Sequence, residues 1–305
     1  MSSFRFDGRV AVVTGAGRGI GRAHARLLAE RGASVVVNDL GGSMEGVGAD
    51  DAPATTVARE ITAAGGVAIA DHRDVSTKSG ADALVVAAVE QFGRIDILVN
   101  NAGIIRWARM HEADADLLAR HLAVHVGGSF NTTRAAWPHM VEQGYGRIVM
   151  TTSTGMLGLP GNLSYATAKG GVVGLMRNLA VEGAEHGIRA NAIAPAAVTR
   201  MAGQSGDEPS AVAPAMAPEQ VAPMVAYLAH EDCPVTGEIY TAGFGHFARL
   251  FIASTEGYVE RDGTPTIEDV AAHWTQINDE AGYSVPADLN EWSAAFTAHL
   301  RPATP

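Results

Sequence analysis

The feature that most constrains this sequence is a glycine-rich turn between an apolar, β-rich run and a helical segment. The run RVAVVTG leads into TGAGRGIG, residues 14–21, and then into RAHARLLAERG. Glycines let a backbone approach a pyrophosphate closely, and the helix start offers free N–H groups and the positive end of its dipole. Ordinary tight turns share the pattern, but here a strand precedes it and a helix follows. We therefore expect a dinucleotide site that includes Gly15, Arg18, Gly19, Ile20 and Gly21.

The alternation of β-rich runs and longer alanine-rich segments continues along most of the chain. It predicts an α/β fold, a Rossmann-type doubly wound parallel sheet of about seven strands with helices on both faces. An irregular loop between Thr199 and Pro218 should overhang the crevice at the carboxyl ends of the strands. After Gly245 the alternation stops. We expect residues 1–245 to form the dinucleotide-binding domain, and residues 246–305 a C-terminal helical extension packed on it, with helices near 266–281 and 287–300.

Composition argues against several classes of function. The 305 residues are 47% hydrophobic, enough for a substantial core, and the net charge of −11 disfavours binding to nucleic acids or anionic membranes. A single cysteine, Cys233, makes a disulfide scaffold or a zinc cluster implausible, and we expect no metal. The sequence shows no signal-peptide pattern, no apolar run of roughly 18 residues and no Ser-Lys-Leu type ending. We expect a cytoplasmic protein without a membrane or nucleic-acid partner.

The second β-rich run, SVVVND, ends in Asp39, which indicates the choice of cofactor. A carboxylate there can accept hydrogen bonds from the adenosine ribose hydroxyls and would repel a 2′-phosphate, so we expect NAD rather than NADP. Arg18 could instead contact a 2′-phosphate, although a solvent-facing arginine is the simpler interpretation. Asp74 and Val75 follow the third run, where a carboxylate could bind the adenine amino group or begin a turn.

Taken together, these motifs resemble the short-chain dehydrogenase/reductase family. The resemblance rests on TGAGRGIG, RDV, NNAG, a serine with Y-x-x-x-K, and IAPAAVT, in that family's order over about the first 245 residues. Ala196 departs from the glycine often found after Pro195. Within the family the chain is most similar to the (3R)-hydroxyacyl-CoA dehydrogenase unit of peroxisomal multifunctional enzyme type two and its bacterial relatives, some of which act on hydroxysteroids. The resemblance implies further cofactor contacts from Asn101, Ala102, Gly103, Pro195, Val198 and Thr199.

The segment SYATAKGG places a tyrosine and a lysine one helical turn apart, at Tyr165 and Lys169. Tyrosine is a poor base, but a neighbouring ammonium and the positive nicotinamide ring favour its phenolate. The resemblance assigns Tyr165 as the acid/base and Lys169 as its partner and a contact of the nicotinamide ribose. Counting from Gly146 makes Ser153 the substrate-orienting hydroxyl, whereas counting back from Tyr165 gives Thr152; we prefer Ser153.

His125 stands where most of the family has an asparagine that joins a proton relay. The hydroxyacyl-CoA group also has histidine there, and a neutral imidazole can both donate and accept a hydrogen bond. We therefore expect a catalytic role for His125, although a buried histidine with satisfied nitrogens is the alternative. His121 and His125 are also spaced to share a metal ion, but no cysteine or carboxylate cluster completes such a site.

The substrate side of the sequence is less informative. Arg106, Arg109 and Arg200 are candidates for the phosphates of an acyl-CoA, or solvated surface charges, while Met156, Leu157, Leu159 and Met201 suit an acyl chain or a steroid equally. We expect NAD-dependent oxidation of a 3-hydroxyacyl-CoA or a hydroxysteroid. The alternatives are an NADPH-dependent 3-oxoacyl-(acyl-carrier-protein) reductase and a non-catalytic NAD-binding sensor or structural protein. Long helices with several apolar faces predict a homodimer or homotetramer.

Overall fold

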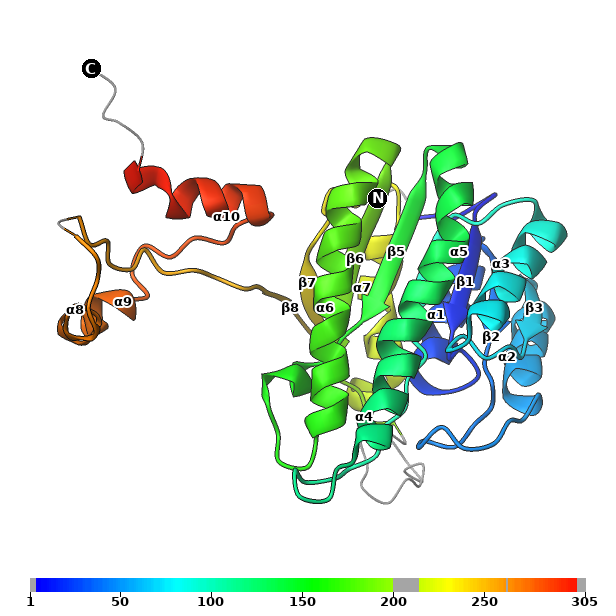
Figure 1. Cartoon of the computed structure of the whole chain (residues 1–305). Helices are drawn as coiled ribbons and strands as arrows, with labels where there is room; N and C mark the ends of the chain where they lie inside the picture. Colours follow the sequence, from blue (N-terminus) through cyan, green and yellow to red (C-terminus); the bar gives the residue numbers. More distant parts are fainter. Residues whose placement is uncertain (1–3, 200–213, 262, 301–305) are drawn as a thin grey trace. The chain divides into compact units, whose positions relative to one another are not determined.

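The computed structural model describes residues 4–199, 214–261 and 263–300, and its elements alternate as the sequence indicates (Figure 1). The strands of the sheet are β1 Val10–Thr14, β2 Ser34–Asn38, β3 Val67–Asp71, β4 Ile97–Asn100, β5 Gly146–Thr151, β6 Ile188–Pro195, β7 Ile239–Gly243 and β8 His246–Leu250. The helices around it are α1 Gly19–Glu30, α2 Ala52–Ala63, α3 Lys78–Phe92, α4 Ala115–Leu122, α5 Gly128–Gln143, α6 Leu163–Gly183 and α7 Ala222–Ala229.

The eight strands form one sheet in the order β3-β2-β1-β4-β5-β6-β7-β8, and the pairs from β3 to β7 are parallel. The order reverses at β1, which pairs with β2 on one side and β4 on the other. A reversal of this kind opens a crevice at the carboxyl ends of the strands, where doubly wound folds bind ligands. The predicted fold class is therefore confirmed, with one strand more than expected.

That extra strand follows a two-residue connection from β7 to β8. Phe244 and Gly245 have φ angles of 54° and 74°, the left-handed values that a tight hairpin turn requires. The sheet thus runs past the predicted boundary at Gly245. That boundary was predicted there because the alternation of strands and helices in the sequence stops at Gly245. Contacts divide the chain after Arg249, into a unit of residues 1–249 and a second unit of residues 250–305.

Both faces of the sheet are covered, which explains why its central strands are buried and rich in apolar residues. Every residue of β1, β4 and β5 is buried. Helix α3 contacts α5, and α4 contacts α6, whereas α1 contacts α2 and α7. Parallel strands buried on both sides need continuous apolar sequences, and Val, Ile and Leu dominate these three strands.

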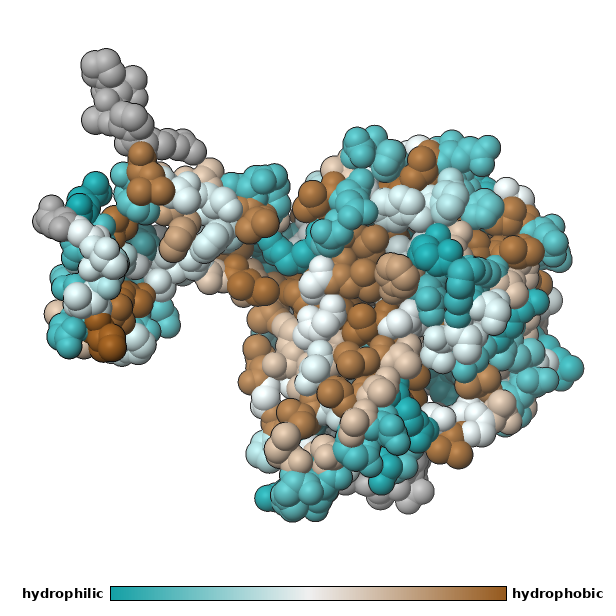
Figure 2. Space-filling model, in the orientation of Figure 1, coloured by the Kyte–Doolittle hydropathy of each residue, from teal (hydrophilic) through white to brown (hydrophobic). Residues whose placement is uncertain are grey.

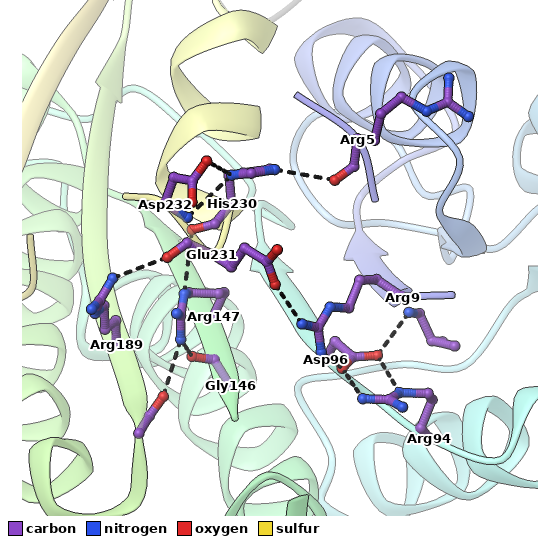
Figure 3. Close-up of polar contacts among 12 residues, drawn as sticks. Arg5, Arg9, Arg94, Asp96, Gly146, Arg147, Arg189, His230, Glu231 and Asp232 are labelled. Carbon is purple, nitrogen blue, oxygen red and sulfur yellow. Dashed lines mark hydrogen bonds and ion pairs between the residues drawn. The ribbon is translucent and has the colours of Figure 1, made fainter. Parts of the chain in front are cut away.

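At the amino ends of the strands a network of arginines and carboxylates joins β1, β4, β5 and the end of α7 (Figure 3). The fully buried Asp96 accepts from Arg9 at 3.0 Å and from Arg94 at 2.7 Å. Arg9 also pairs with Glu231 at 2.7 Å. Arg147 is buried and donates only to main-chain oxygens of the described residues, including Gly187 O at 3.0 Å. The network fixes the sheet's amino edge, opposite to the crevice.

In its described residues the second unit has three short α-helices, α8 Ile267–Ala272, α9 Trp274–Ile277 and α10 Leu289–Phe296, and a 3-10 turn at Ala298–Leu300. Helix α8 starts with a capping box, in which Thr266 and Asp269 satisfy each other's main-chain N–H groups. The helix expected near 266–281 is broken at His273, and the one expected near 287–300 is shorter than predicted. That this unit packs on the sheet domain stays a prediction. Among the described residues, no helix is both long and apolar enough to cross a membrane.

Candidate functional site

A cavity of about 1160 Å³ lies at the carboxyl ends of the strands and is lined from the turns after β1 to β6. A smaller cavity of about 400 Å³ at the amino edge contains neither the glycine turn nor the tyrosine and lysine, so we take the larger one as the site. All sixteen residues predicted to contact the cofactor line it: Gly15, Arg18, Gly19, Ile20, Gly21, Asp39, Asp74, Val75, Asn101, Ala102, Gly103, Tyr165, Lys169, Pro195, Val198 and Thr199.

The glycine turn is packed too tightly for side chains. A Cβ atom on Gly21 would lie 2.2 Å from the Gly15 oxygen, and one on Gly15, whose φ is 62°, would lie 2.8 Å from Ala102 Cα. The Asn101 side chain holds the turn in place by donating to Thr14 O and Gly15 O, both at 3.0 Å. Part of the role of Asn101 is thus to join β4 to the turn.

The start of α1 has the properties of an anion site. No side chain caps it, and its first turn carries no acidic residue, so its free N–H groups are available to a ligand. Arg18 stands at the N-cap and lines the cavity. These features, and the depth to which the turn lets a ligand approach, fit the pyrophosphate of a dinucleotide.

Asp39 is held in a fixed orientation beside the turn. Its Oδ2 accepts from the Gly17 N–H at 2.8 Å, and its Oδ1 accepts from the Gly41 N–H at 2.7 Å. Each oxygen keeps a lone pair for a further donor such as a ribose hydroxyl. Asp74 also lines the cavity, and its carboxylate accepts from the Ser76 N–H at 2.9 Å, so it both shapes a turn and faces the groove.

Tyr165, Lys169 and Ser153 meet in this cavity. The Lys169 Nζ lies 5.4 Å from the centre of the Tyr165 ring and donates to Thr151 O at 2.6 Å. Burial lowers the pKa of Lys169 to about 7. Burial raises the pKa of Tyr165, and a hydrogen bond with Ser153 offsets part of that rise. The tyrosine therefore has both an ammonium and a hydroxyl beside it.

The two hydroxyls that the sequence left open, Ser153 and Thr152, differ in position. Thr152 is fully buried, does not line the cavity, and donates to Lys169 O at 2.8 Å. Ser153 lines the cavity, and its Oγ accepts from the Gly155 N–H at 3.0 Å. Since strand residues alternate in direction, only one of two neighbours can face the crevice.

His125 lies in a π-helical turn, Ala123–Gly127, and its ring meets Tyr165 edge-on at 5.3 Å between centres. Its Nε2 is 3.2 Å from the Ile104 N–H nitrogen and 2.8 Å from the Ile104 oxygen. Burial, and then the charge of Lys169, hold the pKa of His125 well below its usual value. The neutral ring thus binds the loop after β4, and its side chain does not line the cavity.

His121 is committed to hydrogen bonds of its own. Its Nδ1 is 2.8 Å from Leu117 O, and its Nε2 accepts from the Arg106 N–H at 3.3 Å. The rings of His121 and His125 stack at 6.1 Å. Within the described ranges no group of three or more metal-ligating side chains is present.

The predicted substrate residues are only partly brought together. Leu159 lines the cavity, whereas Arg106, Arg109, Met156 and Leu157 do not. Arg200 and Met201 lie outside the described residues. Other lining residues were not predicted from the sequence, among them Trp107, Arg120, Asn162 and the segment after β2 that includes Ser43, Met44 and Gly46. The glycines of that segment were the available signal.

Comparison with known proteins supports one family. A sequence model described as short chain dehydrogenase matches residues 9–209. A short-chain type dehydrogenase/reductase of Mycobacterium tuberculosis is 44% identical over 278 residues, which are 91% of this chain and 96% of that protein. Mouse peroxisomal multifunctional enzyme type 2 is 43% identical over 296 residues, 95% of this chain but only 39% of that enzyme.

A solved structure of 7α-hydroxysteroid dehydrogenase, complexed with NADH and 7-oxo glycochenodeoxycholic acid, has a TM-score of 0.69 and 30% sequence identity. It covers 79% of this chain and 95% of that one. The chain thus spans nearly all of the mycobacterial protein and less than half of the mouse enzyme.

Proposed function

Because the chain belongs to the short-chain dehydrogenase/reductase family, we propose that it is an NAD-dependent alcohol dehydrogenase that interconverts a 3-hydroxyacyl-CoA and its 3-oxo form. The observation that carries this proposal is the meeting of Ser153, Tyr165 and Lys169 in the cavity that holds the glycine turn and Asp39. A non-catalytic NAD-binding protein would not need all three side chains at one point of that cavity.

In the proposed mechanism Tyr165 removes the hydroxyl proton of the substrate. A bound nicotinamide would supply the hydride acceptor for the carbon that bears this hydroxyl, so the alcohol would lose one proton from oxygen and one hydride from carbon. Burial disfavours the phenolate, as the raised pKa of Tyr165 shows. Lys169 is close enough to stabilise it while protonated. The Thr151 oxygen keeps the ammonium in place.

Ser153 orients the substrate oxygen in this proposal. Its hydroxyl lines the cavity beside Tyr165 and can donate to the oxygen on which negative charge develops. Thr152 is unsuited to that role, because its hydroxyl is used by the main chain of α6. We assign His125 to positioning: through Ile104 it fixes the loop after β4, and its ring supports Tyr165.

NAD is the proposed cofactor because of Asp39. The carboxylate is fixed by two main-chain N–H groups and would face the ribose hydroxyls. A 2′-phosphate carries a charge of about −1.5 to −2 and would be repelled there. The alternative of an NADPH-dependent acyl-carrier-protein reductase calls for a basic residue near position 39 and a basic docking surface, and the chain has neither an arginine nor a lysine between Asp39 and Asp51.

The acyl-CoA substrate is favoured over a steroid by the similarity to multifunctional enzyme type 2, whose hydroxyacyl-CoA dehydrogenase unit the sequence motifs resemble. The substrate end of the cavity includes Trp107 and Leu159, which suit an acyl chain and equally a steroid. A hydroxysteroid is therefore the second candidate, supported by the neighbouring steroid dehydrogenase structure. A cytoplasmic location remains a prediction beside relatives named as peroxisomal.

We also propose a homo-oligomer formed through α5 and α6. Figure 2 shows apolar side chains gathered over these two helices at the centre of the view. Phe130 on α5 is 49% exposed, and Val181 on α6 is 51% exposed. The exposed Gly170 and Gly174 leave the outer face of α6 open to close packing by another helix.

The test of the function is a screen of NAD and NADP against 3-hydroxyacyl-CoA thioesters and hydroxysteroids, followed by the absorbance of reduced nicotinamide. The proposal expects turnover with NAD and the thioesters, at a kcat/KM at least about tenfold above that with NADP. Turnover of steroids alone would reassign the substrate, and a preference for NADP would overturn the role of Asp39.

A further inference from the structure

The segment after β2, residues 40–51, is a long connection that leads to α2. It extends from the cofactor side of the cavity to the β4 side and back. In Figure 1 it leaves β2, runs toward the foot of α4 and returns to α2. Leu40, Gly42, Ser43, Met44 and Gly46 all line the cavity. We call residues 40–51 the strap.

The near end of the strap is tied to Asp39. The Gly41 N–H donates to Asp39 Oδ1 at 2.7 Å, and the Asp50 N–H donates to Leu40 O at 2.9 Å, which closes the base of the strap. Gly41 has a φ of 78°, and a Cβ atom there would lie 1.9 Å from Asp50 O. Only glycine fits where the two limbs of the strap meet.

The far end of the strap is tied to the other side of the cavity by three hydrogen bonds and one close packing contact. The Ile105 N–H donates to Met44 O at 2.9 Å. The Arg120 Nη2, at the end of α4, donates to Glu45 O at 3.1 Å and to Gly46 O at 3.3 Å. Gly46 packs so closely on Ile104 that a Cβ atom would lie 2.9 Å from its Cγ2. Since both ends are anchored, the strap spans the groove.

The charge of the strap has one sign. Residues 39–51 contain no lysine or arginine and four carboxylates, Asp39, Glu45, Asp50 and Asp51. Asp39 alone binds at the ribose in the proposed cofactor site, while the other three are exposed. None of these three lines the cavity, so they would act on a bound dinucleotide through the electrostatic field of the loop, which favours the species without a 2′-phosphate.

We propose that the strap is a second determinant of cofactor choice, acting beside Asp39, and that Arg120 is the positioning residue that holds it across the groove. This inference rests on the proposed function, because it takes the cavity as a dinucleotide site. It places discrimination against NADP in three exposed carboxylates as well as in the ribose contact.

The role of the strap's charge is tested with a variant in which three strap carboxylates are neutralised. A control variant removes three negative charges elsewhere, from α3, α5 and the turn after α6. The strap variant carries Glu45→Gln, Asp50→Asn and Asp51→Asn; the control carries Glu90→Gln, Glu142→Gln and Glu185→Gln. We expect the strap variant to bind NADP about fivefold more tightly at low salt, with NAD affinity unchanged, and the gain to vanish at 1 M salt, where the Debye length is about 3 Å. Equal effects in the two variants would contradict a role for the strap's charge in cofactor choice.

The anchoring of the strap by Arg120 is tested without cofactor, by measuring the hydrogen-exchange rates of the Ile105 and Gly46 amides. We expect Arg120→Ala to speed exchange there about three- to tenfold and Arg120→Lys to restore part of the protection. Arg134→Ala is the matched control, since it also removes an exposed helix arginine that contacts another element, Asp82 of α3. Unchanged exchange in Arg120→Ala would overturn the anchor.

Titration of the wild type with NAD separates this inference from the function itself. If the wild type binds NAD and the strap variants behave as their controls, only the strap proposal fails. If the wild type binds neither NAD nor NADP, the proposed function fails, and with it the strap's role in cofactor choice, whatever the exchange data show.

Discussion

The Lys169 ammonium donates to the main-chain oxygen of Thr151 at 2.6 Å and lies 5.4 Å from the centre of the Tyr165 ring. The lysine is 3% exposed, and its burial lowers its pKa from 10.5 to about 7. A buried amine next to a phenol is costly to keep charged, and that cost has a measurable dependence on pH.

Stability should rise with pH because of Lys169. Between pH 7 and 10.5 the unfolded chain binds the lysine proton and the folded chain increasingly does not, so the penalty is full below pH 7 and is relieved as the pH rises. We expect the unfolding free energy of the wild type to gain about 2 kcal/mol from pH 7 to 9 relative to Lys169→Met. Denaturant titrations at both pH values measure it; parallel behaviour of the two proteins would contradict the lowered pKa.

Replacing Asp39 should change cofactor preference. Asp39→Asn removes the charge and leaves one side-chain oxygen for the Gly17 and Gly41 N–H groups. We expect weaker NAD binding and a loss of about tenfold in the ratio of NAD to NADP affinity. Calorimetric titration with both cofactors provides the numbers. A variant that kept the wild-type ratio would remove Asp39 from the selection of cofactor.

The His125 side chain is expected to act by position rather than by titration. Asparagine can donate to the Ile104 oxygen and accept from its N–H, so His125→Asn should keep kcat within about threefold, while His125→Leu, which can do neither, should lose at least about tenfold. The low pKa of His125 also means that its ionisation should be absent from the pH profile of kcat/KM near neutrality. A step that disappears in His125→Asn would show that the imidazole itself titrates in catalysis.

We expect the network of arginines and carboxylates at the amino ends of the strands, centred on Asp96, to contribute strongly to the stability of the fold. Asp96 is fully buried and accepts from two arginines and from the Val10 N–H. Asp96→Ala leaves the Val10 N–H without its acceptor and removes the anion beside two partly exposed arginines, of which Arg9 keeps Glu231, so we expect a loss of about 3 kcal/mol in unfolding free energy. The exposed pair of Arg5 and Asp7 is the control, and Arg5→Ala should leave the melting temperature unchanged. Similar losses in both variants would contradict this difference.

The sequence predicted the sheet because its strands are buried on both faces and are therefore rich in apolar residues, as in Val10–Thr14 and Ile97–Asn100. Strand β8 was missed since an edge strand such as His246–Leu250, mostly exposed, carries no such pattern. The C-terminal helices were also predicted to be longer than they are. The local cap at Thr266 marks where α8 begins, but no sequence signal marked its break at His273.

That the residues predicted to bind the cofactor line one cavity could be anticipated, because glycines and strand ends mark the turns at its edge; that they bind a cofactor stays a prediction. The choice between Ser153 and Thr152 was not, because it depends on which hydroxyl faces the crevice, and a one-residue shift reverses that. The strap was also missed. Its contacts with Ile105 and Arg120 join segments far apart in the chain and are accepted by main-chain oxygens of the strap, so its glycines were the available signal in the sequence.

The most direct test of the account is Tyr165→Phe, assayed with NAD and a 3-hydroxyacyl-CoA beside direct measurement of NAD binding. Removing the phenolic oxygen removes the proposed base and leaves the ring against His125. We predict that kcat falls by about 10² to 10⁴, while the Kd for NAD stays within about twofold of the wild type. Wild-type turnover by Tyr165→Phe, with NAD bound normally, would contradict the claim that Tyr165 is the acid/base of this site.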